Sequence, residues 1–264
     1  MSEIQRKILS SKEKGIGRLV FNNPERRNAM SLEMWKTTTE VLQKFNEDPD
    51  VLVIVLSGAG GKAFVSGADI SKFESERASV EDTVHYNEST AAAIKILHHS
   101  EKPSIAMIRG FCMGGGLTLS LSCDLRFCTS DSFFGLPAAK LGVGYSFDGI
   151  RLLTEIVGPA NAREICFTGN RFSAEEALQM KLVNRIYPTT EIEGFVDECA
   201  TVIAGNAPLT LAAMKQIFIE LSKDPEVRDL ERCRGKIERC FSSKDYVEGR
   251  KDFLEKRKPN FQGE

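Results

Sequence analysis

The feature that most restricts the fold of this chain is a continuous apolar run at residues 51–56, bounded by Asp50 and Gly58. A strand with one solvated face would alternate apolar and polar residues, so the run predicts a strand buried on both faces. Residues 103–108 predict a second such strand, and a helix is expected over about residues 80–98. Ser31 is a candidate N-cap for another helix, with apolar residues at helical spacing up to Phe45. Buried strands covered by helices indicate an α/β fold.

The alternation of predicted strands and helices continues along the chain, and beyond about residue 190 only helices are predicted. Strands are predicted at 17–21 and 125–128, a helix at 117–122, and a glycine-punctuated loop over 135–149. Beyond about residue 190 helix periodicity dominates, at 195–203, 209–221, 229–239 and roughly 244–257. We therefore expect an α/β core over residues 1–200, which carries the functional site, and a helical region over residues 201–264.

Composition narrows the classes of function. The 264 residues carry a formal net charge of −2, which argues against binding to nucleic acid or an anionic membrane. Seven cysteines are scattered without a Cys-x-x-Cys pair and only three histidines are present, so a metal site is not expected. Residues 1–7 lack the apolar core of a signal peptide, and no long apolar run spans a membrane. These features favour a cytoplasmic protein with reduced thiols.

Two glycine-rich stretches follow predicted strands. The first is GGKAFVSGADI at residues 60–70, where Gly67 and Ala68 allow close approach to the backbone. The second is RGFCMGGGL at residues 109–117, which opens a helix and leaves N–H groups uncovered at the positive end of its dipole. The first stretch alone fits a tight turn equally well. The second stretch lacks the lysine of a phosphate loop and the spacing of a dinucleotide loop, and its uncovered N–H groups suit an oxyanion.

Further motifs extend along the chain. They are Asn22-Asn23-Pro24 with Asn28-Ala29, Cys123-Asp124, Phe134-Gly135 with Leu141-Gly142, Val157-Gly158, FTG at 167–169, AEEA at 174–177, LVN at 182–184 and FLEKRKPNF at 253–261. With the two glycine stretches, this set resembles the crotonase (enoyl-CoA hydratase/isomerase) superfamily over essentially the whole chain.

The resemblance implies a crotonase-type spiral of ββα repeats with a C-terminal helical region that assembles a homotrimer or a hexamer. The oxyanion-hole donors would be the backbone N–H groups of Ala68 and Gly115. No separate cofactor is implied, because coenzyme A arrives as part of the acyl-CoA substrate. The residues that would contact coenzyme A are Arg26, Arg27, Ala29, Lys62, Ala68, Asp69 and Ile70, with Phe253 and Lys256 from a neighbouring subunit.

The chain departs from the family pattern at the acid–base positions. A hydratase of this family would carry one glutamate where this chain has Thr118 and another where it has Ala138. Isomerases keep a carboxylate at the second position or a few residues beyond, where this chain has Ser146. None of these three side chains takes a proton from carbon or water near neutral pH.

An oxyanion hole without an acid–base pair suits a reaction that generates its own carbanion. Loss of CO₂ from a malonyl-type thioester is such a reaction, and the loop at 142–150 with the ending at 245–261 resembles the methylmalonyl-CoA decarboxylase branch. Tyr145 would orient the leaving carboxylate there. That branch has a histidine where this chain has Ala68, so the match is partial. Alternatives are a hydratase or isomerase with substituted acid–base residues, thioester hydrolysis, and acyl-CoA binding without turnover.

Three side chains have competing interpretations. Asp148 is the one carboxylate in the loop expected to wall the acyl pocket; desolvated there it would serve as a base, and otherwise it is a surface residue. Tyr145 is either a pocket hydroxyl or a packed aromatic. His85 either reaches the pocket or is an exposed helical residue.

Overall fold

The computed structural model describes residues 7–264, so the expectation about a leader peptide concerns residues outside the described part. The described residues form two sheets. The larger one has the order β1 (Ile8–Glu13), β2 (Ile16–Phe21), β3 (Val53–Gly58), β5 (Ser104–Ile108), β7 (Leu125–Thr129) and β10 (Arg185–Tyr187). The smaller one has the order β4 (Ala63–Val65), β6 (Phe111–Met113), β8 (Phe133–Gly135) and β9 (Arg171–Ser173). Among the strand pairs of the described part of the chain, β1–β2 and β8–β9 are antiparallel and the others are parallel.

Helices connect and cover these strands. They are α1 (Leu32–Glu47), α2 (Phe73–Glu76), α3 (Val80–His98), α4 (Gly115–Leu121), α5 (Ala138–Leu141), α6 (Phe147–Thr168), α7 (Ala174–Gln179), α8 (Ile192–Ala204), α9 (Pro208–Leu221), α10 (Leu230–Phe241) and α11 (Lys244–Glu255), with single 3₁₀ turns at Pro24–Arg26, Ile70–Lys72 and Pro225–Val227. In three successive repeats, which begin at β3, β5 and β7, the first strand joins the large sheet, the next joins the small sheet, and a helix follows. This is the expected spiral of ββα units.

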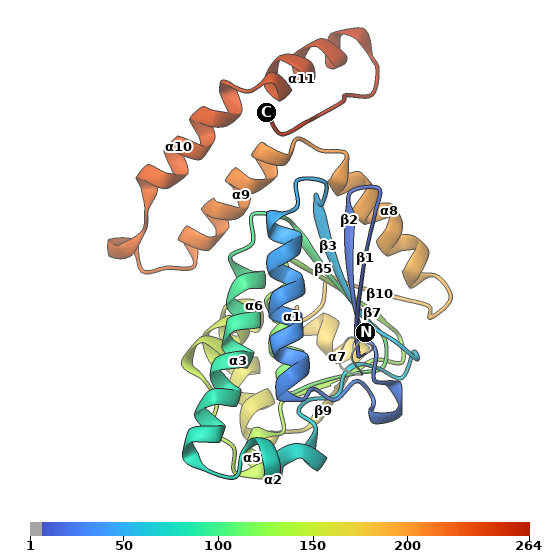
Figure 1. Cartoon of the computed structure of the whole chain (residues 1–264), viewed down its shortest axis with the longest axis vertical. Helices are drawn as coiled ribbons and strands as arrows, with labels where there is room; N and C mark the ends of the chain where they lie inside the picture. Colours follow the sequence, from blue (N-terminus) through green and yellow to red (C-terminus); the bar gives the residue numbers. More distant parts are fainter. Residues whose placement is uncertain (1–6) are drawn as a thin grey trace.

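Strand β3 shows why its sequence is apolar throughout. Val53 and Val55 belong to a cluster with Ile192 and Val196 of α8, whereas Ile54 and Leu56 belong to the main core with residues of α1. Figure 1 shows α8 and α1 on opposite sides of the large sheet. The prediction of a strand buried on both faces is confirmed.

The helix signals at residue 31 and at residues 80–98 are also confirmed. Ser31 caps α1, where its side chain accepts a hydrogen bond from the Met34 N–H, and Ser79 forms a capping box with Asp82 at the start of α3.

The loop prediction for residues 135–149 is wrong in part. It contains the short helix α5 and the start of α6, because Ser146 accepts a hydrogen bond from the Gly149 N–H and so caps α6. The small sheet was not predicted, because strands of three residues have too few positions to show a period.

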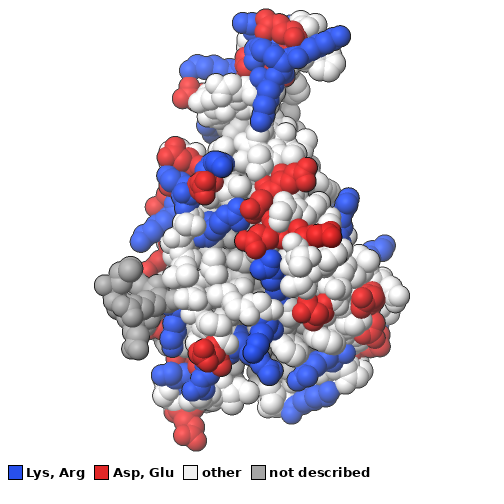
Figure 2. Space-filling model, turned by 90° about the vertical axis from the view of Figure 1, so that its right-hand side faces the viewer, with Lys and Arg blue, Asp and Glu red and all other residues white. Residues whose placement is uncertain are grey.

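The C-terminal helices project from the body of the molecule (Figure 1). The expected boundary at residue 200 falls inside α8, which packs on the sheet, and α9 begins at Pro208 after a turn. Figure 2 shows Lys and Arg interspersed with Asp and Glu on one face, with wide areas of uncharged residues between them. Among the described residues no single helix is long and apolar enough to cross a bilayer; α8 and α9 pass that test only as a pair, bent by 103°.

Candidate active site

The two glycine-rich stretches lie against each other at the start of α4. Gly67 and Gly114 both have positive φ, at +112° and +54°, and a Cβ on Gly114 would lie 3.8 Å from the Gly67 Cα. At Gly116 a Cβ would meet the Val65 carbonyl oxygen at 2.4 Å. Glycines are therefore required for both the turn geometry and the close contact of α4 with β4.

Two backbone N–H groups border the same space. Gly115 is the first residue of α4, so its N–H has no acceptor within the helix. Ala68 forms an isolated parallel bridge with Met30, in which the Met30 N–H donates to Gly67 and the Asp69 N–H donates to Met30. Because successive N–H groups of an extended chain point to opposite sides, the Ala68 N–H faces away from this bridge.

Ala68 and Gly115 line one cavity of about 680 Å³. Its other lining residues come from α1, from the segment around α2, from α3 and α4, and from the loop between α5 and α6: Trp35, Arg77, Thr83, Tyr86, Asn87, Thr90, Ala91, Ile94, Thr118, Leu141, Gly142, Val143, Gly144, Tyr145 and Ser146. Of the described residues that line it, none is Asp or Glu, and Arg77 is the one with a charge. The cavity thus offers neutral donors and one cation.

Two hydroxyls meet beside Gly114. The Tyr145 hydroxyl forms a short hydrogen bond with the Thr118 hydroxyl and donates to the Gly114 carbonyl oxygen at 3.2 Å. Burial raises the pKa of Tyr145 to about 12, so its hydroxyl stays protonated and acts as a donor. Tyr145 lines the cavity and its ring also packs against the main core, so its position fits both interpretations.

A further set of hydrogen bonds holds the part of the cavity wall formed by α1 and α3. The Trp35 indole N–H donates to the Tyr86 hydroxyl at 3.0 Å, and that hydroxyl donates to the Met30 carbonyl oxygen at 3.0 Å. Burial raises the pKa of Tyr86. Both side chains are almost fully buried, so these bonds tie α1 to α3 at the edge of the cavity.

Of the residues expected to contact coenzyme A, Ala68 alone lines this cavity, and the others of the core lie in two neighbouring segments, 26–29 and 62–70. The segment 26–30 runs beside 66–69, where the Ser66 N–H donates to the Arg27 carbonyl oxygen at 3.2 Å. Arg26, Arg27 and Lys62 are exposed, Ala29 and Asp69 are buried, and Ile70 is 67% exposed. The Asp69 carboxylate is used locally, since it accepts hydrogen bonds from the N–H and the hydroxyl of Ser71.

Other candidates lie outside the cavity. The Asp148 side chain is 79% exposed on the first turn of α6, 4.0 Å from Arg151, so the desolvation that would make it a base is missing. His85 is exposed on α3 and does not line the cavity, whereas its neighbour Tyr86 does. Cys112 is buried, and burial raises the pKa of its thiol to about 12.

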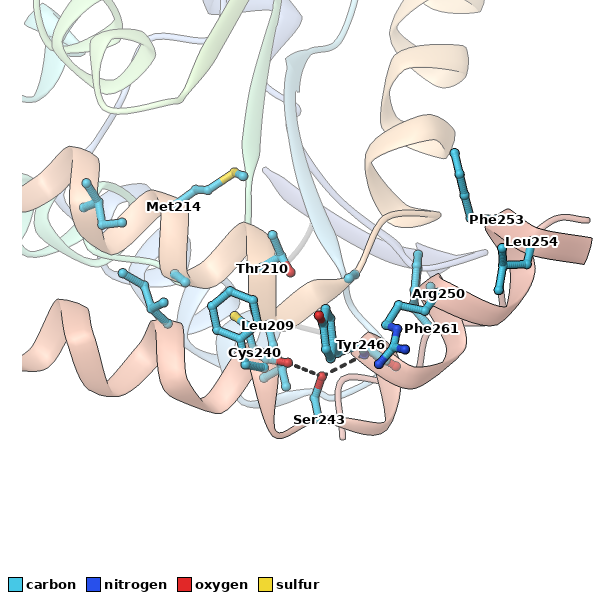
Figure 3. A pocket seen from close by; sticks show the side chains of 17 residues that line it. Leu209, Thr210, Met214, Cys240, Ser243, Tyr246, Arg250, Phe253, Leu254 and Phe261 are labelled. Carbon is cyan, nitrogen blue, oxygen red and sulfur yellow. Dashed lines mark hydrogen bonds between the residues drawn. The ribbon is translucent and has the colours of Figure 1, made fainter. Parts of the chain in front are cut away.

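Phe253 lies in a different place. Together with Leu254 it lines an apolar cavity of about 750 Å³ between α9, α10, α11 and the C-terminal tail (Figure 3). Its side chain is 82% exposed, and Lys256 ends α11 in a left-handed conformation with φ 52°. Neither residue lines the cavity at Ala68 and Gly115 of its own chain.

Trp35, Arg77, Tyr86 and Asn87 were not singled out as site residues from the sequence. In the sequence, Trp35 and Tyr86 occupy positions typical of the apolar face of a helix. Arg77 lies in a polar segment between α2 and α3. The spacing of Thr83, Asn87 and Thr90 on one face of α3 was the available signal of a polar cavity wall.

Comparison with known proteins agrees with this geometry. A family model for enoyl-CoA hydratase/isomerase matches residues 11–264. A short-chain-enoyl-CoA hydratase of Clostridium acetobutylicum is 32% identical over 254 residues, covering 95% of both chains. A peroxisomal Delta(3,5)-Delta(2,4)-dienoyl-CoA isomerase of Arabidopsis thaliana is 32% identical over 265 residues, covering 96% of this chain and 95% of the relative.

Among solved structures, an enoyl-CoA hydratase/carnithine racemase from Magnetospirillum magneticum superposes with a TM-score of 0.91 at 33% identity, covering 98% of this chain and 96% of that one. With the paired glycine stretches, the ββα spiral and a match along nearly its whole length, the chain belongs to the enoyl-CoA hydratase/isomerase family.

Proposed function

We propose that the protein binds an acyl-CoA thioester and stabilises its enolate between the N–H groups of Ala68 and Gly115. The observation that carries this proposal is that the two residues line the same cavity. In the surrounding secondary structure neither the Ala68 N–H nor the Gly115 N–H has a hydrogen-bond acceptor. Such donors act where negative charge develops on the thioester oxygen, and losing one costs about 10²–10³ in rate.

The reaction we favour is decarboxylation of a malonyl-type thioester. It needs no base: the bond between the α-carbon and the carboxylate breaks, its electron pair enters the enolate, and the α-carbon then takes a proton from water. A cavity lined by hydroxyls, amides and one arginine, without Asp or Glu among the described residues, suits this chemistry better than proton abstraction. Tyr145, as a protonated donor beside the hole, would hold the leaving carboxylate.

Hydration or isomerisation of an enoyl-CoA is the second candidate. The names of the Clostridium and Arabidopsis relatives favour it. In this chain the proton transfers would fall to water held by Thr118 and Tyr145, because Thr118 stands at the first glutamate position and lines the cavity.

Product analysis by mass spectrometry separates the candidates. Purified protein is mixed with methylmalonyl-CoA, crotonyl-CoA and a 3-enoyl-CoA. Loss of CO₂ that falls at least tenfold in Tyr145→Phe supports decarboxylation. Rapid hydration of crotonyl-CoA would refute it in favour of the second candidate. Three unchanged thioesters that nevertheless bind would reduce the function to acyl-CoA binding.

The proposed contacts to the phosphate groups of coenzyme A require a separate test. Arg26, Arg27 and Lys62 are exposed cations in the neighbouring segments that precede Met30 and Ala68, and their charge is suited to the phosphate groups of coenzyme A. Replacing each by Ala should weaken binding of free coenzyme A, with little effect on the choice between acyl groups. Equal affinity in all three variants would remove these residues from the proposed site.

We further propose that the chain assembles as a trimer or hexamer through its C-terminal helices. Large apolar side chains of α9 and α11 are exposed, among them Phe218 at 69%, Phe253 at 82% and Leu254 at 81%. Exposed apolar surface of this kind is typical of an interface. Sedimentation should give three or six times 29.3 kDa, and a monomer at micromolar concentration would refute the proposal.

A further inference from the structure

The peptide group between Gly114 and Gly115 carries one of the two proposed oxyanion-hole donors. Its N–H belongs to Gly115, the first residue of α4, and its carbonyl belongs to Gly114. Because a trans peptide is planar, its C=O and its N–H point in opposite directions. A group that fixes the Gly114 carbonyl oxygen therefore also fixes the direction of the Gly115 N–H.

Glycine on both sides makes this peptide easy to rotate. Gly114 has φ 54° and ψ −121°, and the lack of a Cβ on either residue removes most of the steric cost of turning the peptide between them. The Gly114 N–H donates to the Gly135 carbonyl oxygen at 2.9 Å, but this bond holds the preceding peptide. The backbone of α4 contributes one bond to the peptide in question, from the Thr118 N–H to the Gly114 oxygen at 3.1 Å.

Two side-chain hydroxyls contact the same carbonyl oxygen. The Thr118 hydroxyl lies 3.4 Å and the Tyr145 hydroxyl 3.2 Å from the Gly114 oxygen, and the two hydroxyls are hydrogen-bonded to each other. The contact between the hydroxyls can use only one of their two protons, so at least one proton is donated to the Gly114 oxygen. When a ligand carboxylate takes the proton of Tyr145, the Thr118 hydroxyl still holds the carbonyl.

Both hydroxyls are held in place by packing. Thr118 is 3% exposed on α4. The Tyr145 ring packs so closely on Gly149, at the start of α6, that a Cβ added to Gly149 would lie 2.9 Å from Tyr145 Cε1. Hydrogen bonds donated to a carbonyl oxygen also polarise the peptide, which makes its N–H a stronger donor. The two hydroxyls can thus act on the Gly115 N–H in two ways, by direction and by strength.

We propose that Thr118 and Tyr145 are positioning residues of the oxyanion hole, whose hydroxyls fix and polarise the peptide between Gly114 and Gly115 through its carbonyl oxygen. The inference rests on the proposed stabilisation of an enolate. It also gives a use to the hydroxyl at the first glutamate position. An ionised carboxylate at position 118 could only accept hydrogen bonds, whereas the threonine hydroxyl donates one to the carbonyl.

The test compares a ligand that forms an enolate with one that stays neutral. The enolate fraction of bound acetoacetyl-CoA is measured at a fixed pH by its ultraviolet absorption, and the affinity for butyryl-CoA is measured by calorimetry. Thr118→Val keeps the shape of the side chain and removes the hydroxyl. The ionisation constant of bound acetoacetyl-CoA should fall about threefold to tenfold, a part of the roughly 10²–10³ for loss of a whole donor. Affinity for butyryl-CoA should stay within about twofold, because a neutral acceptor gains less from a strengthened donor.

Other variants isolate the hydroxyls. Tyr145→Phe should lower the ionisation constant to a similar extent, and the double variant should lower it further than either change alone. Thr118→Ser keeps a hydroxyl and should recover most of the wild-type value. Thr154→Val is the matched control: the Thr154 hydroxyl donates to the Ile150 carbonyl oxygen of α6 at 2.7 Å, and Thr154 does not line the cavity. Both measurements should be unchanged in it.

The outcomes separate this inference from the function on which it rests. A wild-type ionisation constant in both Thr118→Val and Tyr145→Phe would overturn the inference and leave the oxyanion hole intact. So would an equal loss of butyryl-CoA affinity in variants that thermal unfolding shows to be folded, since packing alone would explain it. If Thr118→Val does not fold, Tyr145→Phe decides. A wild-type protein that binds acetoacetyl-CoA without raising its enolate fraction above that in water would overturn both.

Discussion

Replacing Gly116 by Ala tests the central geometric claim, that contact between α4 and β4 sets the position of the Gly115 N–H. The added Cβ would lie 2.4 Å from the Val65 carbonyl oxygen, 2.6 Å from its Cβ and 2.8 Å from its Cγ1. All three atoms belong to a buried strand, so none of them is the far end of a flexible side chain.

The size of the effect follows from these distances. Real Cβ contacts are essentially never shorter than 3.0 Å, so the start of α4 must move away from Val65 by at least 0.6 Å. Overpacking of this kind costs about 1–3 kcal/mol of unfolding free energy. A misplacement near 1 Å of a positioned group costs up to about 10² in rate. Gly115 is the adjacent residue, so we expect a loss of about tenfold or more in affinity for an enolate-forming thioester.

Acetoacetyl-CoA is a suitable ligand, because it forms an enolate without turnover and its binding is measured by calorimetry. Urea unfolding gives the stability of the same variant. Gly194→Ala is the matched control: Gly194 lies on the exposed side of α8 with no atom within 4 Å of an added Cβ, so it should gain about 0.5–1 kcal/mol without a change in binding. Wild-type stability and affinity in Gly116→Ala would refute the reasoning.

Three further outcomes are expected. Burial lowers the pKa of His98 to about 4, below its ordinary value near 6.5, so the stability from keeping it neutral is complete above pH 6.5 and is lost as pH falls toward 4. Between pH 7 and 4.5, His98→Gln should therefore lose about 2 kcal/mol less unfolding free energy than the wild type, and parallel curves would contradict this. Lys215, 7% exposed, reaches from α9 to the Asp124 carboxylate at 2.7 Å. Lys215→Met should lower stability by about 2 kcal/mol in urea unfolding, while an unchanged midpoint would mean that packing alone holds α9. Since burial raises the pKa of Tyr145 to about 12, the wild type and Tyr145→Phe should have rate profiles of the same shape between about pH 6 and 9, and a step present only in the wild type would count against a protonated donor.

Much of the fold followed from local sequence. The apolar run at 51–56, the capping serine at 31 and the helix over 80–98 each depend on interactions within a few residues or on simple burial, and all three occur as predicted. The short strands of the small sheet and the start of α6 at Phe147 were missed, because their hydrogen-bonding partners lie far away in sequence or inside a glycine-rich segment.

The candidate site likewise has features that the sequence predicts and features that depend on the tertiary structure. The sequence by itself determined that two glycine stretches follow strands, that the carboxylates of a hydratase are replaced at Thr118 and Ala138, and that the chain resembles one superfamily. The tertiary structure alone decided which side chains surround those glycines. It placed Asp148 and His85 outside the cavity and brought Arg77 onto Tyr86 within it. The physical reason is that a backbone turn is encoded by its own residues, whereas the environment of a charged side chain depends on packing between α1, α3 and the loop before α6.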